Sequence, residues 1–140
     1  MNKIIIDGSD AIFGRLCSFA AKKVLEGNEI IIVNSGKVLI TGNRNDIVSK
    51  YDTLRKKGGF SQKGPKISRS ASTILKRAVR GMIPDFRRGI GKESFKRIKC
   101  YNNIPEELKN EKILKMDYPR KLKFIELNEL VRSIWIIKIN

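Results

Sequence analysis

The stretch KIIIDGSDAIFGRLCSFAAKKVLEGNEIIIV, residues 3–33, decides the fold class. It opens with three consecutive isoleucines and closes with a second apolar, mostly β-branched run, Ile30 to Val33. Between the two runs, apolar residues recur at helical spacing, and Gly27 stands where a helix commonly ends. Strand, helix and strand within roughly thirty residues form a βαβ unit, in which the continuous apolar strands are parallel and covered by helices.

The rest of the chain continues this alternation of strands and helices. The pattern predicts a strand (37–41), a helix capped near Asn43 (43–54), a glycine-rich loop (57–65), a helix (70–81), a short helix (92–97), a strand (98–101) and a last helix (127–134). We therefore predict an α/β fold, a three-layer α/β/α single domain around a small, largely parallel sheet.

Length and composition suit one folded domain. The chain has 140 residues, of which 41% are hydrophobic, so it can bury one core. We expect a single domain over 1–140, with a basic segment at 55–99 and a C-terminal extension from about 106 whose role is open. The start lacks the apolar run of a signal peptide, and no stretch approaches the ~20 apolar residues of a membrane span, so we expect a cytoplasmic protein with no membrane partner.

Positive charge is concentrated in the middle of the chain. There are 30 Lys and Arg against 14 Asp and Glu, a formal net charge of +16. Residues 55–99 contain 15 of the cations and 2 of the acids, so 15 − 2 = +13 of the excess lies there. Self-repulsion opposes such an excess in a compact chain, which favours a polyanionic partner. A solvated face or a disordered tail is the alternative, but the segment is internal and carries helix-spaced apolar residues.

No catalytic constellation is found in the sequence. Histidine, the commonest general base, is absent from the composition. Two glycine-containing windows do not match the phosphate-binding P-loop motif. In the first, Pro65 occupies the lysine position, and in the second, Glu93 stands where the motif needs a hydroxyl residue. Gly8 and Gly14 do not form a dinucleotide fingerprint. We predict no enzyme, no cofactor and no small-molecule substrate.

Two cysteines and an acid pair could suggest other chemistry. Cys17 and Cys100 are too few and too far apart for a zinc site or a disulfide framework, and we interpret both as core residues. Asp7 and Asp10 could hold Mg²⁺ in principle, but an acid pair between a strand and a helix more often caps a turn. We therefore predict no metal site.

Several motifs resemble a known family. Gly14-Arg15-Leu16-Cys17-Ser18 follows the first strand, and the most specific run is Arg77-Ala78-Val79-Arg80-Gly81-Met82-Ile83-Pro84. On these motifs the first three-quarters of the chain resemble the large-subunit ribosomal protein thirteen family, and its archaeal-type branch most closely. Cys17 stands where alanine is usual and Ile83 where leucine is usual, and both are mild changes to packing.

The resemblance implies a function that agrees with the charge. It implies a structural constituent of the large ribosomal subunit, bound to large-subunit ribosomal RNA and beside neighbouring large-subunit ribosomal proteins, which supports subunit assembly in the cytoplasm. Two other classes stay open. One is a DNA-binding or general RNA-binding module, although the chain lacks the known RNP, KH and zinc signatures. The other is a nucleotide-using enzyme that acts on RNA.

Thirteen cations of the basic segment are the candidate RNA-binding residues. Lysines on and around the glycine-rich loop can approach phosphates closely, and arginines offer planar forks for phosphate oxygens and for stacking on bases. Phe60 and Phe86 are candidates for base stacking, with core packing as the alternative for each. The cations are Arg55, Lys56, Lys57, Lys63, Lys66, Arg69, Arg77, Arg80, Arg87, Arg88, Lys92, Lys96 and Arg97.

Overall fold

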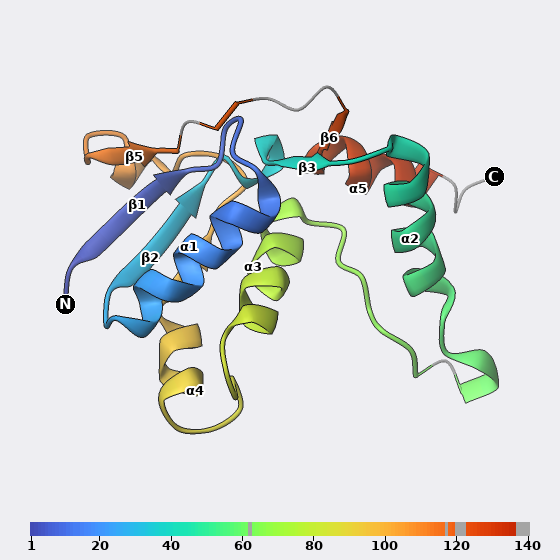
Figure 1. Cartoon of the computed structure of the whole chain (residues 1–140), viewed down its shortest axis with the longest axis horizontal. Helices are drawn as coiled ribbons and strands as arrows, with labels where there is room; N and C mark the ends of the chain where they lie inside the picture. The colour runs from blue at the N-terminus through green and yellow to red at the C-terminus, as the bar shows by residue number, and fades with distance from the viewer. Residues whose placement is uncertain (62, 117, 120–122, 137–140) are drawn as a thin grey trace.

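A four-stranded parallel sheet is the centre of the fold (Figure 1). The structure is a computed structural model that describes residues 1–61, 63–116, 118–119 and 123–136. The strands are β1 (Lys3–Asp7), β2 (Glu29–Val33), β4 (Ile98–Cys100) and β5 (Ile113–Lys115), in the order β4-β2-β1-β5. All three pairings are parallel. The predicted βαβ unit is confirmed, since α1 (Phe13–Leu25) connects β1 to its neighbour β2.

The strand β2 is buried on both faces, which explains its unbroken apolar run. Ile30 and Ile32 belong to the main core cluster, together with residues of α1. Ile31 and Val33 point to the other face, where they pack with Leu108. None of these four β2 residues is more than 4% exposed. A polar residue at any of these positions would have to be buried without water, at a cost of about 1–3 kcal/mol if unpaired.

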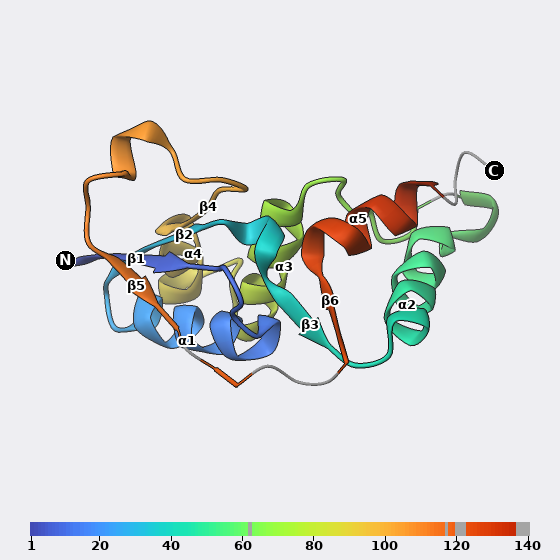
Figure 2. The same ribbon diagram turned by 90° about the horizontal axis from the view of Figure 1, so that it is seen from above.

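The two faces of the sheet are covered differently. The helices α1, α3 (Ala71–Met82) and α4 (Gly89–Lys96) lie on one face, while the 3₁₀ turn η3 (Glu106–Leu108) lies on the other (Figure 2). The predicted α/β class and largely parallel sheet are confirmed. Few residues cover the second face of the sheet: in the described part of the chain they are this turn and its flanking residues.

The C-terminal segment completes the core. The strand β3 (Leu39–Thr41) was expected from the sequence, but it pairs antiparallel with β6 (Phe124–Glu126) in a separate two-stranded sheet. The helix α5 (Leu127–Ile136) follows, and its Leu127, Leu130 and Ile134 are fully buried in the same cluster as β1 and α1. The segment whose role the sequence left open is therefore an integral part of the fold.

The helix α2 (Arg44–Lys56) is the least buried helix. Its start is the one expected, because the Asn43 side chain accepts a hydrogen bond from the Asn45 amide. It packs against α5, and none of its residues is fully buried. Within the described residues, no helix has the length and apolar character needed to span a membrane.

The helix α4 begins at Gly89, three residues before the predicted start at 92. Gly91, in the added first turn, makes a close backbone contact and is buried where α4 crosses the preceding turn. A Cβ at this position would overlap the carbonyl oxygens of Pro84 and Asp85. Two glycines near the start of a short helix obscured the helical pattern, although one of them is required by packing.

This contact gives a prediction on stability. Gly91→Ala should lower the free energy of unfolding by about 1–3 kcal/mol, because a backbone carbonyl cannot move aside as a flexible side chain can. The control is Gly81→Ala in α3, where a Cβ would meet no atom within 4 Å and the change should stabilise by about 0.5–1 kcal/mol. Urea denaturation of both variants measures the difference, and equal effects would contradict the contact.

Both cysteines are free and sheltered from solvent, as predicted. Cys17 of α1 is fully buried, and Cys100 of β4 is partly buried. Burial raises the pKa of the Cys17 thiol to about 12, with a smaller contribution from nearby Cys100. Burial likewise raises the pKa of Cys100 to about 12. Reactivity belongs to the thiolate, so both thiols are inert at neutral pH.

The thiols should therefore be unreactive in the folded protein. At pH 8 we expect no reaction of native protein with a disulfide reagent, and two reactive thiols per chain in denaturant. Because the thiol pKa values are higher in the folded state, they contribute to stability, and this contribution is complete at any pH below the unfolded pKa of 9.0. That contribution is lost as pH rises toward about 12. Rapid labelling of either cysteine in the native protein would refute the burial described.

Candidate nucleic-acid interface

Three adjoining hollows form a groove along α2, the loop that follows it, and α3. The first, of about 290 Å³, lies between α2 and α3. The second, of about 370 Å³, lies between the loop and Trp135 of α5. The third, of about 390 Å³, lies beside Phe95 of α4. Lys66 lines all three, so the hollows adjoin one another there, and we call them together the α2–α3 groove.

The groove is strongly cationic. None of the described residues that line it is acidic. A concave surface with one sign of charge focuses the electric field and attracts a polyanion. The cations that line it are Lys50, Arg55, Lys56, Lys57, Lys66, Lys76, Arg77 and Arg80.

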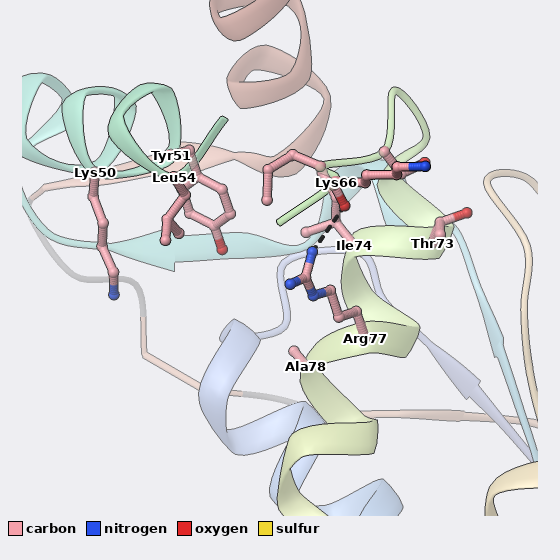
Figure 3. A pocket seen from close by; sticks show the side chains of 10 residues that line it. Lys50, Tyr51, Leu54, Lys66, Thr73, Ile74, Arg77 and Ala78 are labelled. Atoms are coloured by element: carbon pink, nitrogen blue, oxygen red, sulfur yellow. Dashed lines mark hydrogen bonds between the residues drawn. The ribbon is translucent and has the colours of Figure 1, made fainter. Parts of the chain in front are cut away.

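The helix α3 positions the central arginine of this groove. Ile74, Leu75 and Val79 are buried, so Arg77 lies on the outer face of the helix, as the spacing predicted. The Arg77 Nη1 donates a hydrogen bond of 2.9 Å to the Lys66 carbonyl oxygen (Figure 3). This bond ties the loop to α3 and fixes the guanidinium at the border of two hollows, while its other N–H groups remain available.

The other predicted cations divide into several groups. Lys57, Lys63 and Lys66 are exposed on the loop between α2 and α3. Arg69 is exposed as well, and its guanidinium lies 4.2 Å from the centre of the Trp135 ring. A separate group is exposed around α4 without lining the groove: Arg87, Arg88, Lys92 and Lys96.

Two cations at the end of α2 share one carboxylate. Arg55 and Lys56 form ion pairs of 2.7 and 2.9 Å with Asp52. Side-chain hydrogen bonds from Lys56 and then Arg55 hold the pKa of Asp52 below its usual value. The Arg55 side chain is only 14% exposed and lies 5.8 Å from the Trp135 ring centre. The Lys56 side chain is 66% exposed, whereas Arg55 is directed inward.

Arg97 is the predicted site residue most engaged in the fold itself. Its Nη2 donates hydrogen bonds to the Val24 carbonyl oxygen at 3.0 Å and to Ser94 Oγ at 3.2 Å. Val24 lies in the last turn of α1, where its carbonyl also accepts from the Gly27 amide and where a nearby cation interacts favourably with the helix dipole. The side chain therefore joins α4 to the end of α1, a role that residue type alone does not reveal.

The two candidate aromatic residues differ in environment. Phe86 is partly buried and contacts Phe95 edge-on, with ring centres 6.4 Å apart. The guanidinium groups of Arg80 and Arg87 lie 4.7 and 5.4 Å from its ring centre. Phe60 instead is fully exposed in the 3₁₀ turn η2 (Gly59–Ser61), early in the loop between α2 and α3. Core packing therefore applies to Phe86 and is excluded for Phe60.

Sequence reasoning missed two cations and three aromatic residues of the groove, namely Lys50, Lys76, Tyr51, Phe95 and Trp135. Lys50 precedes the basic segment, and Lys76 lies 5.1 Å from the Phe95 ring centre. Tyr51 of α2 was not among the candidate residues, although it lines the first hollow. Helical spacing offered a signal for Lys50, because it lies one turn before Leu54 and thus beside the apolar stripe.

The acid pair after β1 forms a turn, as interpreted. Asp7 Oδ1 accepts hydrogen bonds from the Ser9 amide at 2.9 Å and from Asn34 Nδ2 at 3.0 Å. Asp10 lies in the same turn with a φ of 58°. In the described ranges no three Cys, Asp or Glu side chains gather in a group suited to a metal ion.

Comparison with known proteins identifies the family. A family model described as Ribosomal protein L13 matches residues 1–107, a range that contains α2, α3 and α4. The chain belongs to the ribosomal protein L13 family. The resemblance noted in the sequence is thereby confirmed.

Curated relatives extend the L13 match beyond residue 107. The protein of Picrophilus torridus is 40% identical over 134 residues, which cover 94% of this chain and 96% of the relative. That of Methanocaldococcus jannaschii is 41% identical over 137 residues, with 93% and 96% covered. That of Thermoplasma acidophilum is 41% identical over 113 residues, with 81% and 82% covered. Each is named a large ribosomal subunit protein uL13, not an enzyme, and all three organisms are archaea.

The contrast between Arg97 and Arg88 gives a second prediction for this L13-family chain. Arg97→Ala should lower the free energy of unfolding by about 1–3 kcal/mol, because it removes the hydrogen bonds to the Val24 carbonyl and to the buried Ser94 hydroxyl. Arg88 is exposed and makes no side-chain hydrogen bond to a described residue, so Arg88→Ala should change stability by less than about 0.5 kcal/mol. Thermal and urea unfolding measure both, and an unchanged Arg97→Ala protein would disprove the structural role.

Proposed function

We propose that this chain is a structural constituent of the large ribosomal subunit, working in the cytoplasm, that binds large-subunit ribosomal RNA and supports subunit assembly. The observation that carries the proposal is the α2–α3 groove, whose described lining contains eight cations and no carboxylate. Membership of the L13 family and the names of the relatives support the same reading. Neighbouring proteins of the subunit are the other proposed partners.

The proposed contacts divide by chemistry. Exposed lysines of the loop, such as Lys57 and Lys63, neutralise phosphates without reading sequence. Arg77 and Arg80 present planar guanidinium groups along the groove, where two phosphate oxygens or a base face can be contacted. Folded RNA is recognised mainly by shape, single strands and 2′-hydroxyls, so the proposed target is a folded junction.

Phe60 has a distinct proposed role. It is fully exposed in a loop that also carries Lys57 and Lys63. An exposed aromatic side chain costs free energy in water, and base–aromatic stacking recovers about 1–3 kcal/mol per base. We propose that Phe60 stacks on an unpaired base while the lysines beside it contact the backbone.

Binding to large-subunit ribosomal RNA across a salt series tests the proposed function. If about six phosphates are neutralised, log K should fall with log salt at a slope of about −4 to −5. An equal mass of unrelated structured RNA serves as competitor and should displace the protein poorly. A steep slope without preference would reduce the proposal to generic polyanion binding, and no binding at moderate salt would overturn it.

Single variants should separate stacking from charge. Phe60→Ala should weaken RNA binding about tenfold with an unchanged salt slope, because it removes stacking and no charge. Lys63→Ala should reduce the size of the slope by about one. Leu114→Ala is the control for loss of an exposed apolar side chain, since Leu114 lies on β5, away from the groove. Equal affinities of the Phe60 and Leu114 variants would exclude stacking by Phe60.

A further inference from the structure

We propose that the hollow between α2 and α3 holds one unstacked nucleotide of the bound RNA, with the base inside and its flanking phosphates on the rim. This inference rests on the proposed RNA-binding function and specifies how the RNA is held. We call this hollow the Tyr51 cleft; its lining includes Lys50, Tyr51, Leu54, Lys66, Ile74, Arg77 and Ala78.

The interior of the Tyr51 cleft is apolar and aromatic. Tyr51 and Leu54 project from α2 toward Ile74 of α3 (Figure 3). Tyr51 is only partly buried although it packs against the core cluster, so part of its ring surface faces the cleft. A nucleobase is planar and has an apolar face, and an aromatic or aliphatic wall is the surface on which unstacked bases are held.

The rim of the cleft is cationic on three sides. Lys50 comes from α2, Lys66 from the loop and Arg77 from α3. No acidic side chain is among the described residues of the lining. A purely apolar ligand would make no use of the cationic rim. An acidic peptide would pair with the rim but would leave the apolar interior of the cleft unfilled. An anionic backbone that carries a planar base satisfies both parts.

The size of the cleft suits a single nucleotide. Its volume of about 290 Å³ lies just below the ~300–1,000 Å³ typical of small-molecule sites. A double helix would not enter, so the base must leave its stack. The Arg77 bond to the Lys66 carbonyl holds the loop and α3 together, which presets one wall of the cleft before RNA arrives.

The Tyr51 hydroxyl can contribute hydrogen bonding inside the cleft. It points into the space between the two helices and bonds to no other described residue (Figure 3). Burial raises the pKa of Tyr51, with a further increase from Cys17 that Arg77 partly offsets. The hydroxyl therefore stays protonated at neutral pH and can both donate to and accept from the edge of a base.

The test combines cross-linking with a variant that fills the cleft. The intact protein is bound to large-subunit ribosomal RNA, irradiated with ultraviolet light, and digested with nuclease and trypsin. We expect a nucleotide adduct on the peptide 51–55, which contains Tyr51. Adducts confined to the loop around Phe60 and Lys63, with none on 51–55, would overturn the proposal.

Ala78→Met fills the cleft without a change in charge, because Ala78 lines it from α3. Its affinity for ribosomal RNA should fall about tenfold, the loss expected from one displaced base. Thr53→Met is the matched control, since Thr53 is exposed on α2 and lines none of the three hollows. Tyr51→Phe keeps the ring and should lose only a few-fold. Circular dichroism checks that each variant folds; if Ala78→Met does not fold, cross-linking of the unmodified protein decides.

The outcomes separate this inference from the proposed function. If the unmodified protein shows no preference for ribosomal RNA, the proposed function fails and the cleft inference fails with it. If preference is retained but Ala78→Met binds as tightly as Thr53→Met, only the cleft inference fails. Free AMP or UMP should bind weakly, because the rim contacts need flanking phosphates. Free nucleotide binding as tight as that of RNA would overturn RNA as the source of the nucleotide.

Discussion

Burial of β2 on both faces is the constraint on which the rest of the structure depends. Ile30 and Ile32 require α1, α3 and α4 on one side, and Ile31 and Val33 require the η3 segment on the other. The pairing with β1 and β4 then satisfies the backbone of β2 along both edges. Helices that cover such a strand must turn their apolar stripes inward, so the cations of α3 are left on the outside.

The groove is a consequence of how weakly α2 is held. The core binds α3 through Ile74, Leu75 and Val79, whereas α2 contributes no fully buried residue and packs on α5. Repulsion among the cations between α2 and α3 opposes closer packing of the two helices. A polyanion placed in the groove would lower this repulsion and thereby stabilise the arrangement of the two helices.

Elements with local signals were predictable, and pairings between distant segments were not. Isoleucine runs and helical spacing were sufficient for β1, α1 and β2, and Asn43 marked the start of α2. The strand β3 was expected at the right place, but its partner β6 lies about 85 residues later and has no turn signal that would join the two. The predicted helix at 92–97 began too late, because Gly89 and Gly91 have low helix propensity. Packing against the Pro84 carbonyl nevertheless requires glycine at position 91.

The same distinction applies to the candidate site. Composition located the positive segment, and the periodicity of α3 placed Arg77 on its outer face. Side-chain direction could not be obtained from residue type, because an arginine satisfies a helix C-terminus as well as a phosphate. Arg97 binds the end of α1 and Arg55 turns toward Asp52 and Trp135, while Arg88 remains exposed. A charge count therefore overstates the cations that are free for the proposed RNA contacts, and it omits Lys50, which only the fold brings to the groove.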